Sequence, residues 1–535
     1  MFEKALLTAR VLARTGVIGL DRPDRFMRAL AARRRWDRTP AAAIAIAAAR
    51  FEDDTYLVDE LGELSFADVE RRTNALANGL AAAGIAATDA VAIMCRNSRY
   101  FVEATLACSK LGATALFLNT DFAGPQLAEL AARENPRGVI FDEEFTALLA
   151  GAASGRRQFI AWSDGDAGTG TIEHLIATSD CSPPAPPATP GRQTILTSGT
   201  TGTPKGARRP TISSFFPIVA VLSVIELGAR ETQFVVAPMF HSWGFAHFAL
   251  GLFLGDKLIL RRRFDPEGVL QTIAEQRVNT APMVPVMAQR ILALPNEARR
   301  RYDCSSLTTI PLGGSALQGD LAVRLMDEFG DIVTNSYGST EVGLITIASP
   351  QDLRAAPGTA GPPMPGIVLK ILDPDGREAP RGEVGRIFAA TEVEFEGYTG
   401  GGGKEVIGGA MSSGDVGYVD EAGRLFVSGR DDEMIVSGGE NVFPREVEDL
   451  LASHDAIEEA AAIGIEDPEF GQRLKAYVVL CDGLHLTADD VKSYVRENLA
   501  RFKVPREVEF LERLPRNPTG KILKRELAES ERLRS

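Results

Sequence analysis

Cysteine is scarce in this chain of 535 residues, and no long apolar run occurs in it. The five cysteines are odd in number and widely scattered, without the C-x-x-C spacing of a zinc or redox site: Cys95, Cys108, Cys181, Cys304 and Cys481. This usage is typical of a reducing, cytoplasmic setting. No stretch has the apolar length of a membrane-spanning helix, and the N-terminus lacks the continuous apolar core of a signal peptide. We therefore expect a cytoplasmic protein without a disulfide framework.

Charge is unevenly placed along the chain. The net charge of −14 argues against nucleic-acid binding over the whole surface. Residues 1–40 nevertheless hold ten basic and four acidic side chains, a charge of +6, which leaves −20 for the remainder. Because apolar residues alternate with arginines there, this basic N-terminal extension, residues 1–38, could lie on an anionic membrane as an amphipathic helix. The alternative that we favour is a solvated helix packed on the main domain.

Alternating helix and strand patterns predict the fold class. The composition, 45% hydrophobic and 24% charged, is that of a globular protein, and the length requires more than one core. Thr39-Pro40 and Ser65 with Asp68 are helix-start signals. The expected strands that follow are 56–59, 91–94, 113–118 and 138–141, with helices over 101–111 and 126–134. This order predicts an α/β protein with parallel-rich sheets.

Composition also divides the chain into regions. The Pro-rich stretch 181–187 cannot form a helix interior or a central strand, so it reads as a connector. Short β runs at 368–372, 385–389 and 425–428 indicate a small antiparallel or barrel-like unit. The last hundred residues mix helix and strand patterns as a small α+β domain does. The predicted division is a basic extension over 1–38, a large N-terminal domain over 39–430 and a C-terminal domain over 431–535.

One stretch, residues 195–206, combines hydroxyls, glycines and a lysine directly after an apolar strand-like run. Backbone N–H groups, side-chain donors and the lysine can converge there on a polyanion, which indicates a phosphate-binding loop. It is not a Walker A loop, because Pro204 stands where glycine is needed and Gly206 follows Lys205. An ordinary Ser/Thr/Gly surface turn is the alternative. The candidate phosphate-binding residues are Thr197, Ser198, Gly199, Thr200, Thr201, Gly202 and Lys205.

Further motifs follow this loop in a characteristic order. They are Pro238-Met239-Phe240-His241, Gly313-Gly314-Ser315, Tyr337-Gly338-Ser339-Thr340-Glu341, Ser413-Gly414-Asp415, Gly429-Arg430-Asp431-Asp432 and Pro515-Arg516-Asn517-Pro518-Thr519-Gly520-Lys521. Each is weak alone, but their order and spacing are specific. With them, the chain resembles the adenylate-forming superfamily of acyl-CoA synthetases, luciferases and peptide-synthetase adenylation domains over roughly residues 40 to 530.

The resemblance implies a site that joins a carboxylate to AMP, a reaction in which positioning and electrostatic stabilisation dominate. It places Glu341 on Mg²⁺ and Thr340 on the α-phosphate. Tyr337 would stack on adenine, and Asp415 and Arg430 would bind the ribose. An ordinary turn or a surface salt bridge is the alternative for each of them standing alone. The nucleotide-binding residues implied by these motifs are Gly313, Gly314, Ser315, Tyr337, Gly338, Asp415 and Arg430.

His241 is implied, by the same resemblance, to line the acyl tunnel near the reacting carboxylate. The alternative is a satisfied core histidine. No aspartate occurs between Met239 and Leu254 that could pair with a substrate ammonium, so an uncharged tail is favoured. The apolar run over 245–254 could wall a fatty-acyl channel, although such a run is more often plain core.

The resemblance further implies a mobile C-terminal domain that alternates between two orientations about a hinge at Asp432. One orientation brings Lys521 to the α-phosphate, where the alternative is an ordinary surface lysine. The other brings Ser437, Gly438 and Gly439 to the pantetheine arm of CoA. Two departures stand out: a glycine-rich segment over 397–409 and Ser413 in place of the usual threonine. They leave acyl specificity and loop order open.

We therefore expect an ATP-dependent fatty-acid–CoA ligase that uses ATP, Mg²⁺ and coenzyme A. The alternatives are an aromatic or other carboxylate–CoA ligase, an acyl-AMP ligase that loads a carrier protein, and a non-catalytic nucleotide-binding protein. The expected partners are small molecules and not nucleic acid, while peripheral membrane contact through the basic extension and a homodimer are left open.

Overall fold

A computed structural model describes most of the chain. The described residues are 2–17, 19, 22–165, 168–197, 205–208, 214–392, 395–399, 401–431, 435–437, 440–467, 471–517 and 520–534. Several predicted site residues lie outside them: Ser198, Gly199, Thr200, Thr201, Gly202, Asp432, Gly438 and Gly439.

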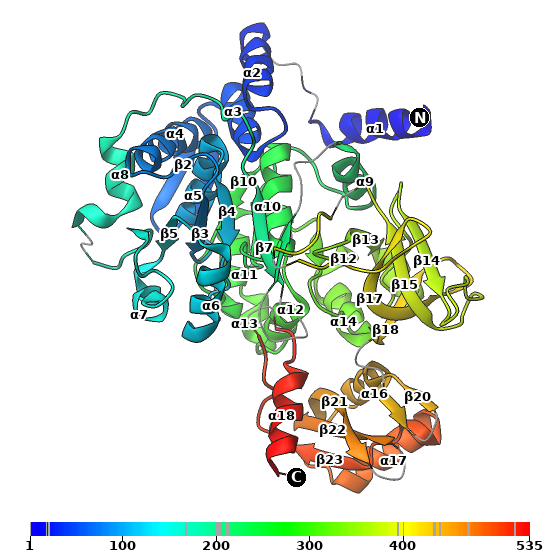
Figure 1. The fold of residues 1–535 in the computed structure, drawn as a ribbon. Coiled ribbons are helices and arrows are strands. Elements are labelled where there is room, and N and C mark those ends of the chain that lie inside the picture. Colours follow the sequence, from blue (N-terminus) through cyan, green and yellow to red (C-terminus); the bar gives the residue numbers. More distant parts are fainter. Residues whose placement is uncertain are drawn as a thin grey trace.

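The first sheet of the large N-terminal domain has six strands in the order β6-β5-β3-β4-β7-β8 (Figure 1). All neighbouring pairs are parallel except β7 with β8. The sequences of β3, β4 and β5 are apolar runs because helices cover these central strands, as in other parallel sheets. The strands are β3 (Ala90–Met94), β4 (Thr114–Phe117), β5 (Gly138–Phe141), β6 (Arg157–Ile160), β7 (Gln193–Thr197) and β8 (Lys205–Arg208).

Two shorter sheets continue the large domain. The order β2-β1-β10-β9 is parallel except for the β1–β2 pair, and β11-β12-β13 combines a parallel and an antiparallel pair. Bridges of Thr280 to Gln233 and to Thr309 connect the two sheets. The strands are β1 (Thr55–Asp59), β2 (Gly62–Ser65), β9 (Thr232–Phe234), β10 (Lys257–Ile259), β11 (Ile310–Leu312), β12 (Val333–Ser339) and β13 (Gly343–Ala348).

Helices pack on both groups of strands, and two of them begin where the sequence predicts. Thr39 accepts a hydrogen bond from the N–H of Ala42, and Ser65 and Asp68 form a reciprocal capping box. The helices are α3 (Pro40–Phe51), α4 (Phe66–Ala82), α5 (Arg99–Leu111), α6 (Gly124–Glu134), α7 (Thr146–Leu149), α8 (Ile172–Thr178), α9 (Phe216–Val224), α10 (Ser242–Leu254), α11 (Pro266–Gln276), α12 (Pro285–Leu292), α13 (Asn296–Arg300), α14 (Gly319–Phe329) and α15 (Pro350–Ala355).

An antiparallel sheet of five strands forms the half-barrel at the side of the large domain, drawn in yellow in Figure 1. The predicted small antiparallel unit is thereby confirmed. Residues 181–187 form neither helix nor strand, as the proline run predicts. The strands are β14 (Val368–Leu372), β15 (Gly385–Ala390), β16 (Val406–Ile407), β17 (Ala410–Val419) and β18 (Leu425–Arg430).

The C-terminal domain is a small α+β unit around its own apolar core, and it lies next to α12 and α14 in Figure 1. Its sheet has the order β20-β19-β22-β21, with β23 paired to β22. Together with the large domain, it confirms the predicted α/β fold class. The elements are β19 (Ile435–Ser437), β20 (Glu440–Val442), α16 (Pro444–Ala452), β21 (Ile457–Asp467), β22 (Gly471–Leu480), α17 (Ala488–Asn498), β23 (Glu507–Phe510) and α18 (Lys524–Arg534).

The N-terminal extension forms two helices instead of the single one expected, α1 (Phe2–Thr15) and α2 (Pro23–Trp36). Helix α1 packs on α9 and buries Val11 in a cluster with Val219 and Leu222. Helix α2 packs on α3 through Trp36. For α1, the structure therefore agrees with the favoured alternative of packing on the main domain. Within the described residues, no helix is long and apolar enough to cross a membrane.

Candidate active site

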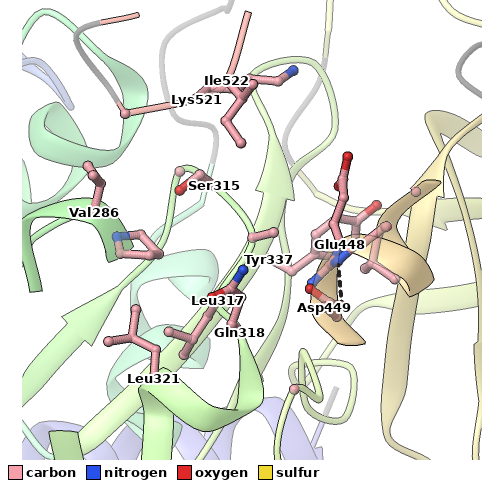
Figure 2. A pocket seen from close by; sticks show the side chains of 18 of the residues that line it. Val286, Ser315, Leu317, Gln318, Leu321, Tyr337, Glu448, Asp449, Lys521 and Ile522 are labelled. Carbon is pink, nitrogen blue, oxygen red and sulfur yellow. Dashed lines mark ion pairs between the residues drawn. The ribbon is translucent and has the colours of Figure 1, made fainter. Parts of the chain in front are cut away.

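A cavity of about 370 Å³ lies between the large domain and the C-terminal domain. The large domain contributes β12, the loop after β11 and the start of α12, while the small domain contributes α16, β21 and the segment before α18. In Figure 2, Ser315 and Tyr337 lie between Lys521 on one side and Glu448 and Asp449 on another. The predicted site residues that line the cavity are Gly314, Ser315, Tyr337, Gly338, Asp415, Arg430 and Lys521.

Asp415 is held by two of the residues predicted to surround the nucleotide. The hydroxyl of Tyr337 donates to Asp415 Oδ2 at 2.6 Å, and a guanidinium N–H of Arg430 donates to Oδ1 at 3.2 Å. Burial raises the pKa of Tyr337, and the Asp415 charge raises it further, so the phenol stays protonated and can donate. Strand pairing sets this geometry, because Asp415 on β17 lies opposite Arg430 on β18.

Ser413 holds the backbone of Asp415. Its hydroxyl accepts a hydrogen bond from the N–H of Asp415 at 3.1 Å and donates to the carbonyl of Ile387 at 3.2 Å. The side chain is 1% exposed. The replacement of the usual threonine by serine therefore keeps the hydroxyl that orients the turn before Asp415.

The glycine pair after β11 is constrained by a tryptophan that sequence reasoning did not single out. A Cβ on Gly313 would lie 3.0 Å from the indole ring of Trp243, and Gly314 has a φ of +83°. Trp243 donates its indole N–H to the carbonyl of Met283 at 3.2 Å, which fixes the ring in place. Gly314 lines the cavity, whereas Gly313 faces the tryptophan and is not among the lining residues.

The Lys521 segment is seated directly on the large domain. A tight turn joins Asn517 and Lys521, since each backbone N–H of the pair donates to the other residue. Gly520 has a φ of +74°, and a Cβ there would lie 2.0 Å from Cγ1 of Val286 on α12. The side-chain amide of Gln289, also on α12, donates to the carbonyl of Glu458 at 3.3 Å. This seat brings Lys521 to the cavity that Tyr337, Asp415 and Arg430 line.

Glu341 lies outside that cavity, in the turn between β12 and β13 with Thr340. The residue is 8% exposed, and the hydroxyl of Tyr398 donates to its Oε1 at 2.6 Å. Tyr398 belongs to the glycine-rich segment that departs from the expected pattern. Its contact with Glu341 shows that this segment is directly tied to the predicted metal ligand.

The same segment is tied to the strand that follows the phosphate-binding loop. Tyr398 bridges Ala207, and the N–H of Thr399 donates to the carbonyl of Gly206 at 2.9 Å. Thr197 and Lys205 face each other in the β7–β8 register, so the two ends of the predicted loop meet across a strand pair. The described part of the glycine-rich segment is therefore ordered by backbone pairing beside the predicted phosphate site.

His241 is the N-cap residue of α10, and its ring contacts Phe240 with centroids 4.5 Å apart. Its Nε2 is buried and has no hydrogen-bond partner among the described residues, although the residue as a whole is partly exposed. Burial lowers the pKa of His241 to about 4. A neutral ring in apolar surroundings is compatible with both interpretations of His241. Further along α10, Phe248, Leu250, Leu252 and Leu254 are buried in core clusters.

Of Ser437, predicted to contact CoA, the structure describes the backbone. It lies at the end of β19, where it pairs with Glu440 and Gly471. The orientation of the two domains in this structure places Lys521 at the cavity.

Ion pairs on the small-domain wall of the cavity were not predicted. They join Arg445 to Asp449 at 3.4 Å, Lys524 to Glu448 at 2.8 Å and Arg516 to Glu459 at 3.0 Å. Figure 2 marks an ion pair of Asp449. Burial raises the pKa of Asp449, against the opposing effect of Arg445. In the sequence, Arg445, Glu448 and Asp449 look like the exposed charges of any amphipathic helix. Arg516 stands in the Lys521 motif, but no local pattern indicates its pairing with Glu459.

The residues present fit a nucleotide with a bound Mg²⁺. The described residues hold no group of three or more His, Cys, Asp or Glu side chains suited to a metal. Mg²⁺, however, usually takes one or two carboxylates together with substrate phosphates and water, and Glu341 can supply one. Ser336, which lines the cavity, has a buried hydroxyl without a hydrogen-bond partner among the described residues. That hydroxyl is available to a bound molecule.

Comparison with known proteins agrees with this arrangement. The AMP-binding enzyme family matches residues 44–399, and the AMP-binding enzyme C-terminal domain matches residues 446–521. A feruloyl-CoA synthase of Amycolatopsis sp is 35% identical over 471 residues, covering 87% of this chain and 93% of that protein. The fatty acid–[acyl-carrier-protein] ligase ScoC of Streptomyces coeruleorubidus is 30% identical, covering 87% and 91%. Among solved structures, ATP-bound MatB from Rhodopseudomonas palustris has a TM-score of 0.82 and 26% identity, covering 92% of this chain and 98% of that one.

Proposed function

We propose, from the premise that the chain belongs to the AMP-binding, adenylate-forming enzymes, that it activates a carboxylic acid with ATP as acyl-AMP and transfers the acyl group to CoA. The observation that carries the proposal is the seat of Gly520 on Val286, because it brings Lys521 to the cavity that Asp415, Tyr337 and Arg430 line. Family membership and the ATP-bound structural relative support ATP as the nucleotide.

In the first half-reaction, a carboxylate oxygen attacks the α-phosphorus and pyrophosphate leaves. Asp415 binds the ribose hydroxyls, Arg430 holds Asp415 and the sugar, and Tyr337 with the Gly314 backbone encloses the adenine. Thr340 donates to the α-phosphate, and Lys521 supplies a positive charge to the oxygens on which negative charge develops. Mg²⁺, held by Glu341, neutralises phosphate charge when it is bound. The loop that contains Thr197 and Lys205 holds the leaving phosphates.

In the second half-reaction, the CoA thiol attacks the acyl-AMP carbonyl and AMP leaves. We propose that the C-terminal domain, residues 431–535, then turns about Asp432, so that Lys521 leaves and Ser437, Gly438 and Gly439 approach the pantetheine arm. The large domain, residues 39–430, keeps the nucleotide. A small contact between the C-terminal domain and α12 suits this exchange, because the contact has to be broken in every cycle.

We propose that the acyl group has an uncharged tail and, more specifically, that the substrate is a fatty acid. An aryl acid is the second candidate. The specific observation in its favour is Trp243, whose fixed ring lies against Gly313 beside His241. The relative named feruloyl-CoA synthase agrees with it, while the relative ScoC agrees with a fatty acid and with a carrier protein as acceptor.

A panel of carboxylates tests the proposal. Fatty acids of increasing length, cinnamic-type acids and an amino acid are each scored for pyrophosphate release, and for AMP formation with and without CoA or a carrier protein. Pyrophosphate release with any acid supports adenylation, and the preferred acid decides between the two acyl classes. If no acid gives pyrophosphate release, the protein is a nucleotide-binding protein without catalytic activity. Cytoplasmic placement and a homodimer remain predictions.

A further inference from the structure

Helix α2 has two faces of different character. It packs on α3 through Trp36, Ala32 and neighbouring small residues. Phe26 is 58% exposed and Met27 is 60% exposed. At about 100° per residue, these two side chains share a face with the partly buried Leu30, on the side away from Ala32. The helix therefore packs on the protein through Trp36 and Ala32, and it leaves the large apolar side chains of Phe26 and Met27 exposed.

The helix that carries this apolar face is also rich in positive charge. The segment over 22–38 holds seven arginines and two aspartates, a net charge of +5, in a chain whose net charge is −14. Arg28 and Arg34 are exposed on α2, and Arg22 precedes its first turn. Asp24 pairs with Arg22 at 3.2 Å and with Arg28 at 3.8 Å, and Asp37 pairs with Arg33 at 2.9 Å. Arg28 also pairs with Glu52 at 3.1 Å. These exposed pairs are weak in water, so they reduce the effective positive charge of the segment only in part.

The place of α2 in the molecule also matters. Figure 1 shows α2 at the end of the large domain opposite the C-terminal domain. A surface that holds α2 would therefore leave the cavity and the moving domain untouched. Helix α1 is different, because its inward face is already occupied by α9, and Leu6, at 42%, is its exposed large apolar residue among the side chains that the structure describes.

We propose that α2 docks the protein on an anionic lipid bilayer, with Phe26, Met27 and Leu30 in the acyl boundary and the arginines at the headgroups. An interfacial helix needs this combination of apolar side chains on one face and flanking basic residues. Charge complementarity selects the partner, because the acidic body of the chain is repelled by anionic lipid, whereas the arginine-rich helix is attracted. The inference does not depend on which acid the enzyme activates.

Co-sedimentation of the full chain with vesicles tests the inference. Pure phosphatidylcholine vesicles are compared with vesicles that also contain phosphatidylglycerol, at low and high salt. We expect binding to the anionic vesicles only, and weaker binding at high salt. Phe26→Ser/Met27→Ser should reduce binding about tenfold or more because it removes the inserted apolar groups. Arg28→Gln/Arg34→Gln should reduce it by about fivefold per charge.

Val368→Ser/Val406→Ser is the matched control, because these valines are 53% and 56% exposed on the half-barrel. It should bind vesicles as the unchanged protein does. All variants are checked for thermal unfolding and pyrophosphate release, which should not change, so that a misfolded variant is recognised. Equal binding to neutral and anionic vesicles, or full binding by Phe26→Ser/Met27→Ser, would overturn the inference. So would a dimer in light scattering that this double variant dissociates, because α2 would then be a protein interface.

Discussion

At the scale of single residues, the role of the Glu341 carboxylate can be tested separately from its contact with Tyr398. Glu341→Gln should reduce pyrophosphate release on the order of a hundredfold or more and raise the Mg²⁺ concentration needed for half-maximal rate, since a neutral amide is a poor ligand for a hard cation. The rate is measured over a Mg²⁺ titration. Tyr398→Phe is the control, because it removes the neighbouring hydroxyl but keeps the carboxylate, and its Mg²⁺ dependence should stay close to that of the unchanged protein. An unaltered Mg²⁺ titration in Glu341→Gln would remove this residue from the metal site.

His241 and His247 carry a second prediction at this scale. Burial lowers their pKa values from 6.5 to about 4 and about 3. The unfolded chain therefore binds more protons than the folded protein below pH 6.5, so the stabilisation is complete above that pH and is lost as the pH falls toward 4. His241→Asn should diminish the loss of unfolding free energy between about pH 7 and pH 5 by about 2 kcal/mol.

Urea unfolding at both pH values measures this difference. His485→Asn, at an exposed position, is the matched control and has no burial to lose. If His241→Asn keeps the full acid sensitivity, the imidazole of His241 is not held neutral in the folded protein.

At the scale of elements, the seat of the Lys521 turn on α12 is the contact to perturb. Gly520→Ala places a Cβ against Val286 and strains a residue with a φ of +74°. We expect pyrophosphate release to fall at least tenfold, because a shift of about 1 Å in a positioned group is costly. Thioester formation from supplied acyl-AMP and CoA should be retained. Val286→Ala removes the atom nearest to the new Cβ, so it should partly restore adenylation in the double variant. Equal damage to both half-reactions would contradict the role of this contact in positioning Lys521 for adenylation.

Elements formed by interactions between residues close in sequence could be predicted, whereas elements that depend on distant contacts could not. The starts of α3 and α4 were predictable because Thr39 and the Ser65–Asp68 pair act within three residues. Strands β5 and β14 have the predicted bounds, since a short apolar run between turn residues is also a local signal. The division of the extension into α1 and α2 was missed, because α1 is defined by its packing on α9.

The candidate site shows the same limit. Its motifs were readable in the chain and bring Tyr337, Asp415, Arg430 and Lys521 to one cavity. The contacts of Tyr398 with Glu341 and of Trp243 with Gly313 join residues distant in sequence, and no local pattern encodes them. A motif does not specify the orientation of the domain that carries it, so the sequence alone could not show that Lys521 lies at this cavity in the present orientation.

At the scale of the whole molecule, the two-orientation mechanism predicts that the half-reactions separate. Lys521→Ala removes a preorganised cation from the phosphate, which should cost about 3–4 kcal/mol, or about a hundred- to a thousandfold in pyrophosphate release. Thioester formation from supplied acyl-AMP should survive, because Lys521 has then left the cavity. Single-turnover assays of each half-reaction measure both effects. Lys524→Ala, which breaks the ion pair with Glu448, is a matched loss of positive charge on the same domain and should affect adenylation much less. Equal loss of both half-reactions in Lys521→Ala would refute the mechanism for this chain.

The pairing of Tyr398 and Thr399 with β8 also bears on how the chain is made. Strand β8 is the last strand of its sheet, and an uncovered edge strand invites pairing with another chain. The segment that meets this edge is synthesised about 190 residues after Ala207. During translation the six-stranded sheet can therefore assemble while its β8 edge is still bare, and the newly made protein depends on the arrival of Tyr398 to end its exposure to aggregation.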